Sequence, residues 1–261
     1  MSESVPIVSD AGLKDKALFL SQYSSFLYGS GVHTSRVIRN TKRIAEALDV
    51  DLKIDGFHKS LMLTVVNKNT GENFSTLTEI PDCPFSFEIN KDLSQLSWEA
   101  VDEHLSFDEI KSRYQSLVAK PRMNPYLVLL LVSLANASFC ALFGGDAVSM
   151  LTVFVATFAG MFLKQRLTAR RVNQFVVFAL SSFVASMVAS ASLFFNTTSE
   201  IALATSVLYL IPGVPLINGF IDITEGHVLS GTARLINAFL LILCIAIGMS
   251  VAIVLFKNSL L

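Results

Sequence analysis

Residues 210–222, LIPGVPLINGFID, form an apolar stretch that is interrupted by two prolines and a glycine. Pro212 and Pro215 each remove a backbone hydrogen-bond donor, and Gly213 allows the chain to unwind between them. In lipid, such a break survives only where protein or a watery cavity replaces the lost hydrogen bonds. The stretch therefore predicts a membrane helix that stops and then restarts.

The restarted helix carries polar side chains on one face. If it begins at about residue 215, it directs the positive end of its dipole into the membrane interior, where a carboxylate binds well. Asn218 and Asp222 share a face because they are four residues apart. An acid near the membrane suggests ion or proton handling, or else it lies at the solvated interface, which we favour for Glu225. Arg234 could pair with an acid, bind an anionic substrate or anchor the following span.

Further apolar stretches bring the expected number of spans to five. They cover about 125–143, 147–163, 173–195, 201–219 and 235–256. The second is short enough to be a re-entrant helix instead. Asn136 in the first span is expected to form an interhelical hydrogen bond, with substrate binding as the alternative. Ser182, Ser186 and Ser190 allow another helix to approach closely, either within this bundle or in a second subunit.

Charge separates this membrane half from a polar N-terminal half. Residues 1–125 contain 14 of the 20 Lys and Arg and 17 of the 21 Asp and Glu, so 6 basic and 4 acidic residues remain in 126–261. This distribution excludes a single water-soluble domain and a disordered chain. The net charge of −1 provides no basic field for nucleic acid, and three cysteines do not fit a secreted disulfide scaffold.

Loop charges indicate the orientation in the membrane. Basic residues precede the first span and fill the loop between the second and third, namely Lys120, Arg122, Lys164, Arg166, Arg170 and Arg171. The opposite loops, 144–146 and 196–200, contain neither Lys nor Arg. By the positive-inside rule, we expect the N-terminal half to be cytoplasmic and the C-terminus to emerge on the opposite side of the membrane. The first 25 residues lack the pattern of a signal peptide, which agrees with this orientation.

The expected domains are a cytoplasmic α+β domain over 1–122 and a transmembrane domain over 123–261. In the first, periodicity predicts a helix over 11–49 broken near Gly29 and Gly31, a hairpin of about 61–65 with 73–80, a third strand near 84–90, and helices over about 92–104 and 107–119. Ser106 and Glu109 fit a capping box for the last helix. A basic face of Arg36, Arg39, Lys42 and Arg43 is expected to be solvated or to contact anionic headgroups.

Motifs for catalysis or cofactor binding are missing from the sequence. It contains no Walker A loop, no dinucleotide-binding glycine motif, no nucleophile elbow and no His-Glu-x-x-His. The four histidines do not have metal-ligand spacing. We therefore expect no enzyme activity, no metal and no cofactor in this chain.

Three motifs in the sequence resemble the threonine/serine exporter (ThrE) family. They are Pro212-Gly213-x-Pro215-Leu216-x-Asn218-x3-Asp222-x3-Gly226-x4-Gly231-x2-Arg234, then Gly29-x-Gly31-x3-Ser35-Arg36-Val37 with a helix ending at Ala47-Leu48, and the Phe143-Gly144-Gly145-Asp146 turn. The chain departs from the family at His33 and Thr34, where members often have small or acidic residues. We assign no role to either position.

The resemblance implies a subunit of a secondary exporter. Full-length members have about twice as many spans, so the chain is similar to the larger subunit of a split form that works with a small membrane subunit as an oligomer. The split pair is associated with succinate export, and single-chain members export threonine and serine. Combined with the residue pattern, this implies a substrate carboxylate at the broken helix, near Pro212, Gly213, Pro215, Asn218, Asp222 and Arg234, with Asn136 as a further candidate.

Two other classes of function remain open from the sequence. One is a membrane-anchored sensor or scaffold, whose N-terminal domain would bind a partner without any flux. The other is a membrane enzyme acting on lipid or amino-acid derivatives, which would need a nucleophile paired with a base.

Overall fold

The computed structural model describes residues 11–57, 59–83, 85–121, 123–195 and 197–259. Arg122 and Asn196 belong to segments whose charges were used to predict the orientation in the membrane, and both lie outside these ranges. The chain is mostly helical and forms two compact units. The first unit comprises Met1–Lys120 with Val214–Leu235, and the second comprises Pro121–Gly213 with Ile236–Leu261. Residues 214–235, which the sequence analysis assigned to the transmembrane domain, therefore group by their contacts with the N-terminal half.

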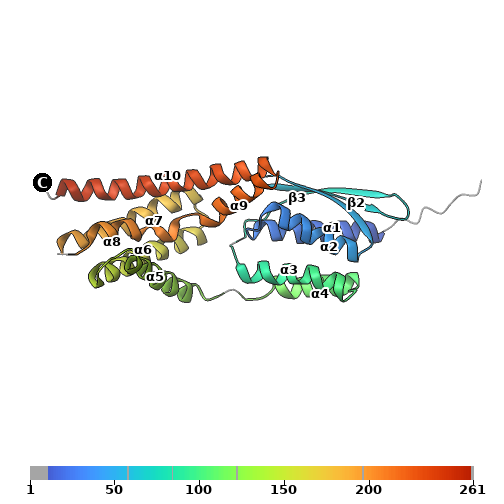
Figure 1. Cartoon of the computed structure of the whole chain (residues 1–261), viewed down its shortest axis with the longest axis horizontal. Helices are drawn as coiled ribbons and strands as arrows, with labels where there is room; N and C mark the ends of the chain where they lie inside the picture. Colours follow the sequence, from blue (N-terminus) through green and yellow to red (C-terminus); the bar gives the residue numbers. More distant parts are fainter. Residues whose placement is uncertain (1–10, 58, 84, 122, 196, 260–261) are drawn as a thin grey trace, which may run out of the picture. The chain divides into compact units, whose positions relative to one another are not determined.

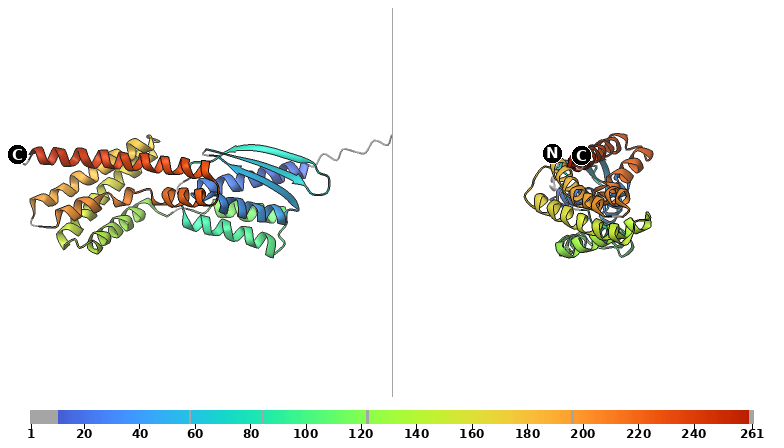
Figure 2. Two further views of the ribbon diagram at one scale, coloured as in Figure 1. Left: turned by 45° about the horizontal axis from the view of Figure 1, so that its top comes forward. Right: turned by 90° about the vertical axis from the view of Figure 1, so that its left-hand side faces the viewer.

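The N-terminal part of the first unit consists of a sheet that is covered by helices, as Figures 1 and 2 show. The antiparallel sheet has the order β1-β2-β3, with strands Val50–Gly56, Ser60–Asn67 and Asn73–Glu79. The helices are α1 (Ala11–Gly29), α2 (Thr34–Ala47), α3 (Phe87–Asp102) and α4 (Phe107–Val118). The α1 and α2 helices pack between the sheet and the α3–α4 pair.

Alternation along the strands places the core between the sheet and the helices. Leu61, Leu63 and Val65 of β2 are buried and face Tyr23 and other apolar side chains of the helices. Burying each such aliphatic side chain contributes about 1.5–3 kcal/mol. The register pairs Ser60 with Glu79 across the hairpin, which keeps these three residues on the covered face.

The expected hairpin is confirmed, but the third strand near 84–90 is wrong. Helix α3 already begins at Phe87, because the Ser86 side chain accepts a hydrogen bond from the Ile89 backbone N–H and caps the helix. The third strand is instead β1, which lies between α2 and the hairpin in the sequence.

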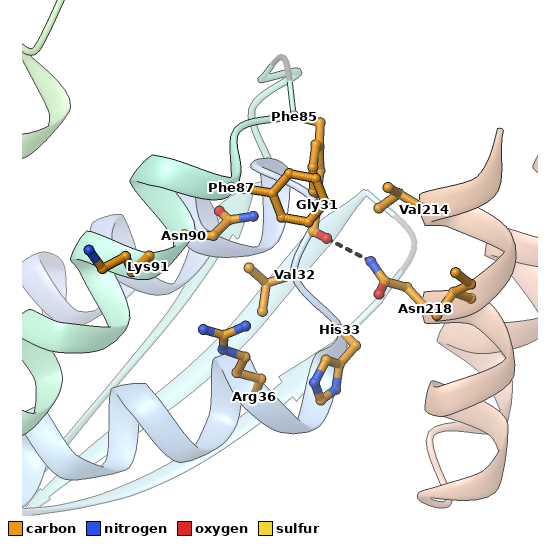
Figure 3. Close-up of a pocket in the computed structure, with 11 residues that line it drawn as sticks. Gly31, Val32, His33, Arg36, Phe85, Phe87, Asn90, Lys91, Val214 and Asn218 are labelled. Carbon is orange, nitrogen blue, oxygen red and sulfur yellow. Dashed lines mark hydrogen bonds between the residues drawn. The ribbon is translucent and has the colours of Figure 1, made fainter. Parts of the chain in front are cut away.

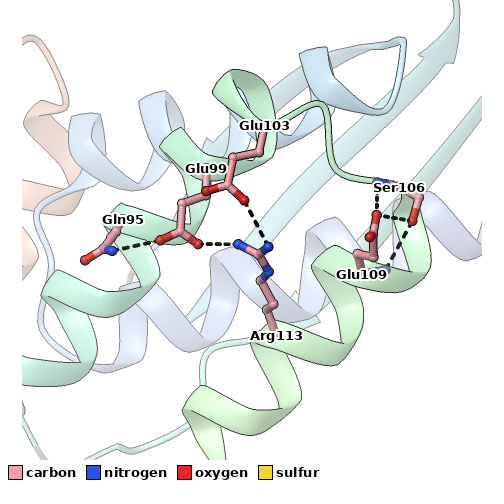
Figure 4. Close-up of polar contacts among 6 residues, drawn as sticks. All are labelled: Gln95, Glu99, Glu103, Ser106, Glu109 and Arg113. Atoms are coloured by element: carbon pink, nitrogen blue, oxygen red, sulfur yellow. Dashed lines mark hydrogen bonds and ion pairs between the residues drawn. The ribbon is translucent and has the colours of Figure 1, made fainter.

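The polar contacts of α3 and α4 follow the sequence pattern, as Figure 4 shows. The capping box is confirmed, since the Ser106 side chain accepts from the Glu109 N–H and the Glu109 carboxylate accepts from the Ser106 N–H. One turn further on, Arg113 donates to Glu99 at 2.8 Å and to Glu103 at 2.9 Å. These contacts fix α4 against α3.

The second unit is a bundle of apolar helices. It contains α5 (Pro125–Leu142), α6 (Ala147–Ala169), α7 (Gln174–Ala189) with the 3-10 turn η1 (Ser190–Phe194), α8 (Ser199–Ser206) with η2 (Leu208–Leu210), and most of α10 (Val228–Ser259). Among the described residues, four helices are long and apolar enough to cross a membrane, or five if residues 199–210 and α9 (Gly213–Thr224) are one span. The second span, short in the sequence analysis, is 23 residues long.

The small residues of α7 are used within the chain. The Ser182 hydroxyl donates to the Ile245 carbonyl of α10 at 2.6 Å. A Cβ added at Gly248 would lie 2.7 Å from the Ser182 Oγ, so the two helices touch closely at this point. Gly160 of α6 approaches the Ser181 carbonyl in the same way. The serine face therefore serves packing inside this bundle.

Candidate functional site

The candidate site is built around the helical hairpin of α9 and the start of α10. Helix α9 begins at Gly213, directly after Ile211 and Pro212, which lie outside the helices. At the other end, Gly226 has a φ of +91°, which a glycine adopts without strain, and α10 follows. The two helices approach closely, because a Cβ added at Gly231 would lie 2.6 Å from the Gly219 carbonyl oxygen.

Asp222 of α9 is fully buried, with 0% of its surface exposed, and its carboxylate is completely engaged. It accepts hydrogen bonds from the Thr34 backbone N–H at 2.6 Å and from the Thr34 hydroxyl at 3.0 Å. Thr34 is the first residue of α2, whose N-cap residue His33 provides no side-chain hydrogen bond. Asp222 therefore caps α2 from another part of the chain, where the helix dipole also favours a negative charge.

Arg234 of α10 is the cationic partner of this carboxylate. Its Nε lies 3.2 Å from Asp222 Oδ2, an ion pair that lacks the alignment of a hydrogen bond. The guanidinium also donates to the Val32 carbonyl at 2.9 Å and lies over the Tyr28 ring, 4.4 Å from its centre. Of the three roles left open for Arg234, pairing with an acid is the one that the contacts show.

Two further side chains of the hairpin bind the backbone of the first unit. The Asn218 amide donates to the Gly31 carbonyl at 2.6 Å, and the Ser230 hydroxyl donates to the Gly56 carbonyl at 2.8 Å. Gly31, in the connection from α1 to α2, has a φ of +91°, a backbone conformation that glycine adopts without strain. The hairpin thus holds both this connection and the end of β1.

A titratable pair lies beside the buried carboxylate. His33 Nδ1 is 3.4 Å from the Glu225 carboxylate. Burial lowers the pKa of His33, although Glu225 and Asp222 act in the opposite direction. A hydrogen bond from Ser35 is the main cause that lowers the pKa of Glu225. At neutral pH we therefore expect a neutral imidazole next to a charged carboxylate.

The other sequence-predicted residues are distributed over both units. Pro215 lies in the first turn of α9, where its missing N–H does not cost a helical hydrogen bond, and Pro212 and Gly213 belong to the second unit. Asn136 is buried in the second unit and donates to Thr157 Oγ1 at 2.6 Å and to the Thr205 carbonyl at 3.0 Å. This is the interhelical hydrogen bond that the sequence analysis expected.

Sequence reasoning missed the partners of Asp222. It assigned no role to His33 and Thr34, yet both lie at the site. One signal was available, since α2 starts without an Asp, Asn, Ser or Thr at its N-cap and so needs an acceptor from elsewhere. Across the described residues, no group of three or more His, Cys, Asp or Glu side chains could hold a metal ion.

The comparison with protein families decides the class of the chain. Residues 19–256 match the family described as "Putative threonine/serine exporter" (ThrE). The chain belongs to this family. Together with the four apolar helices, this membership identifies a membrane protein of a transporter family.

Two curated relatives are similar over most of their length. The chain is 28% identical over 235 residues to "Probable succinate transporter subunit YjjP" of Klebsiella aerogenes, which covers 88% of this chain and 90% of the relative. The protein of the same description from Escherichia coli (strain K12) is also 28% identical over 235 residues, with 89% and 91% covered. No solved structure matches the chain.

Proposed function

We propose that the chain is a subunit of an inner-membrane secondary transporter that exports small carboxylates, with succinate as the first substrate. The observation that carries this proposal is the overlap with two relatives described as probable succinate transporter subunits, over 90% and 91% of their lengths. The word subunit in their descriptions supports a second chain. We propose a small membrane subunit of the YjjB type as this partner.

The loop charges support an orientation for this transporter. Four basic residues lie at the end of α6 and before α7, and none lies in the described parts of the loops on the other side, which favours a cytoplasmic N-terminal half. The C-terminus then lies in the periplasm. Export in this orientation would be driven by the proton gradient or by the gradient of the substrate itself.

In this proposal, the polar residues of the hairpin orient the substrate and couple its movement to a proton. Asn218 and Asp222 lie one turn apart on α9, and we assign the proton exchange to Asp222 because it is a fully buried carboxylate. A proton on Asp222 would weaken the ion pair with Arg234 and the cap on α2. Pro212, Gly213 and Pro215 supply the interruption before this helix, and Asn136 binds a carbonyl near the end of α8.

Export of threonine and serine is the second candidate. The description of the family favours it, and an amino acid presents the same carboxylate as succinate. The two candidates differ in the ammonium group, which requires an acceptor that succinate does not need.

Metabolite efflux from cells lacking this chain tests the proposal. We expect the deletion to reduce succinate efflux, and restoration to require both this chain and its small partner. Unchanged efflux of succinate, threonine and serine would overturn the transport function, and capture of a soluble protein without any flux would favour a scaffold. Lys42→Gln, an exposed change on α2, is the control for expression.

Two variants test the proposed site in the same assay. Asp222→Asn keeps the size of the side chain and removes its charge, so export with an unchanged rate and pH dependence would exclude proton exchange at this residue. Replacing Pro212 and Pro215 by Ala restores the backbone donors, and full activity would show that the break is not needed.

A further inference from the structure

A cavity of about 350 Å³ lies in the first unit, between the start of α2, the segment before and within α3, and the first turns of α9 (Figure 3). Its volume is at the lower end of the roughly 300–1,000 Å³ of small-molecule sites. Every residue that lines it belongs to the first unit. It adjoins the buried Asp222 cluster, because His33 and Asn218 line it, whereas Asp222 and Arg234 do not.

The charged side chains that line this cavity are basic. Arg36 of α2 and Lys91 of α3 line it, and no acidic side chain is among its described lining residues. Elsewhere in the unit, Arg113, Lys120 and Arg234 each contact a carboxylate. Within the described part of the chain, neither Arg36 nor Lys91 forms such an ion pair, so their charges are available to an anion.

Arg36 is held in place by neutral groups. Its Nη2 donates to the Ser94 hydroxyl at 2.9 Å, and that hydroxyl also receives the Asn40 amide at 2.8 Å. Ser94 in turn donates to the Asn90 carbonyl at 2.8 Å. A guanidinium has five N–H donors, so this anchor leaves most of them for a carboxylate, which matches their forked geometry.

The remaining wall of the cavity is apolar and partly open. Phe85 and Phe87 pack edge to face with ring centres 4.3 Å apart, and Val214 and Ile217 of α9 also line the cavity. Phe87 is 76% exposed and Ile217 is 63% exposed. An apolar rim beside a fixed guanidinium is the combination that a small molecule with a charged end and a hydrocarbon body would cover.

We propose that this cavity binds a small organic carboxylate, with the Arg36 guanidinium as the principal partner and the Lys91 ammonium as the second. Lys91 is exposed, so its ammonium can turn toward a ligand that reaches beyond Arg36. A dicarboxylate such as succinate would engage both charges at once. The choice of succinate rests on the proposed function, whereas the binding of a carboxylate rests on the cavity alone.

Isothermal titration of the full-length chain in lipid nanodiscs tests the site. The probes are succinate, its uncharged diamide, threonine and inorganic phosphate. We expect succinate to bind and the diamide to fail. Arg36→Gln should weaken succinate binding about tenfold or more, and Lys91→Gln about threefold, since charged hydrogen bonds contribute more than neutral ones. Arg39→Gln and Lys42→Gln, exposed changes on α2 outside the cavity, should stay within about twofold.

Several outcomes would overturn the proposal. These are no succinate binding at millimolar concentration, phosphate binding as tight as succinate, or equal losses in Arg36→Gln and Arg39→Gln. If Arg36→Gln misfolds, the succinate affinity of Lys91→Gln tests the proposal instead. Lys91 is exposed, so its replacement should leave the fold intact.

Failure of the transport function is distinguishable from failure of the cavity. Efflux that the deletion leaves unchanged, together with succinate binding that depends on Arg36, would reject the transport function and keep the cavity. Suppose instead that efflux requires the chain, but succinate binds equally well to the wild type and to both cavity variants. This result would reject carboxylate binding in the cavity and keep the transport function.

Discussion

Asp146 and Asp222 both cap the start of a helix, but they do so in opposite ways. Asp146 caps its own helix α6, where its Oδ1 accepts from the Ser149 N–H at 2.8 Å and from the Thr197 hydroxyl at 2.5 Å. These hydrogen bonds, with Thr197 first, lower the pKa of Asp146 to about 2. Asp222 caps α2 from 188 residues further along the chain and is paired with Arg234.

The difference shows what a carboxylate at a helix start can do. Asp146 is partly exposed and joins the start of α6 to Thr197 and Thr198, so its loss removes hydrogen bonds to neutral groups. Asp222 is buried and joins three segments, so its loss leaves the buried Thr34 N–H without its acceptor and the Arg234 guanidinium without its carboxylate. We therefore expect Asp222 to matter more for both stability and function.

The largest effect is expected for Asp222→Ala. Removing one member of a buried ion pair costs about 3–5 kcal/mol, because the remaining charge stays buried. We expect a matching loss of unfolding free energy in detergent, measured by urea titration. The matched control is Glu225→Ala, an acid one turn further on that is partly exposed. Equal effects of the two variants would contradict the special position of Asp222.

Gly231→Ala should have the second largest effect, because the added methyl group would push α10 away from α9, the helix that carries Asp222. The new Cβ would meet the Gly219 carbonyl and the Ile223 side chain, at 2.6 and 2.7 Å. We expect a loss of about 1–3 kcal/mol, typical of overpacking, although alanine has the higher helix propensity. Thermal unfolding measures it, and Gly213→Ala is the steric control because its Cβ would meet nothing within 4 Å. Stability equal to that of the control would refute the close contact.

Asp146→Ala should have a smaller effect, confined to the second unit. It removes the acceptor for Thr197 and Ser149, and we expect Tm to fall by only a few degrees. In a double variant with Asp222→Ala, the two losses should add, since the residues share no partner. A marked departure from additivity would show that the two caps are coupled.

The smallest expected effect is a pH dependence of the stability, which should arise near Asp222 and not near Asp146. Burial lowers the pKa of His33, so the unfolded chain binds the proton more tightly and stability falls as pH drops below about 6.5. Asp146, with its pKa of about 2, stays charged over the same range and should contribute no change. The decrease in Tm from pH 7.5 to pH 5.5 should be larger for the wild type than for His33→Gln. An equal decrease in both would exclude His33 as the origin.

The local features of the fold could be predicted from the sequence. The capping box at Ser106, the hairpin and the amide hydrogen bond of Asn136 depend on spacing or on a single polar group in an apolar helix. The strand expected near 84–90 failed because a serine cap at Ser86 outweighed the short apolar pattern.

The partners at the site could not be predicted in the same way. The spacing of Asn218 and Asp222 indicates that they share a helix face, but it does not indicate which surface lies opposite. That surface is the Gly31–Thr34 connection, almost 190 residues earlier in the sequence. For the same reason Arg36 was interpreted as part of a solvated basic face, although it is anchored by Ser94 of another helix.

The contact between Gly219 and Gly231 has a consequence for related sequences. The distance between α9 and α10 is set by two missing side chains, and the Arg234–Asp222 ion pair requires that distance. A chain with larger residues at both positions would have to hold these helices further apart and pair its carboxylate differently. A related sequence with glycine at both positions and an arginine one turn after the second is therefore expected to form the same ion pair, and this pattern can be recognised from sequence alone.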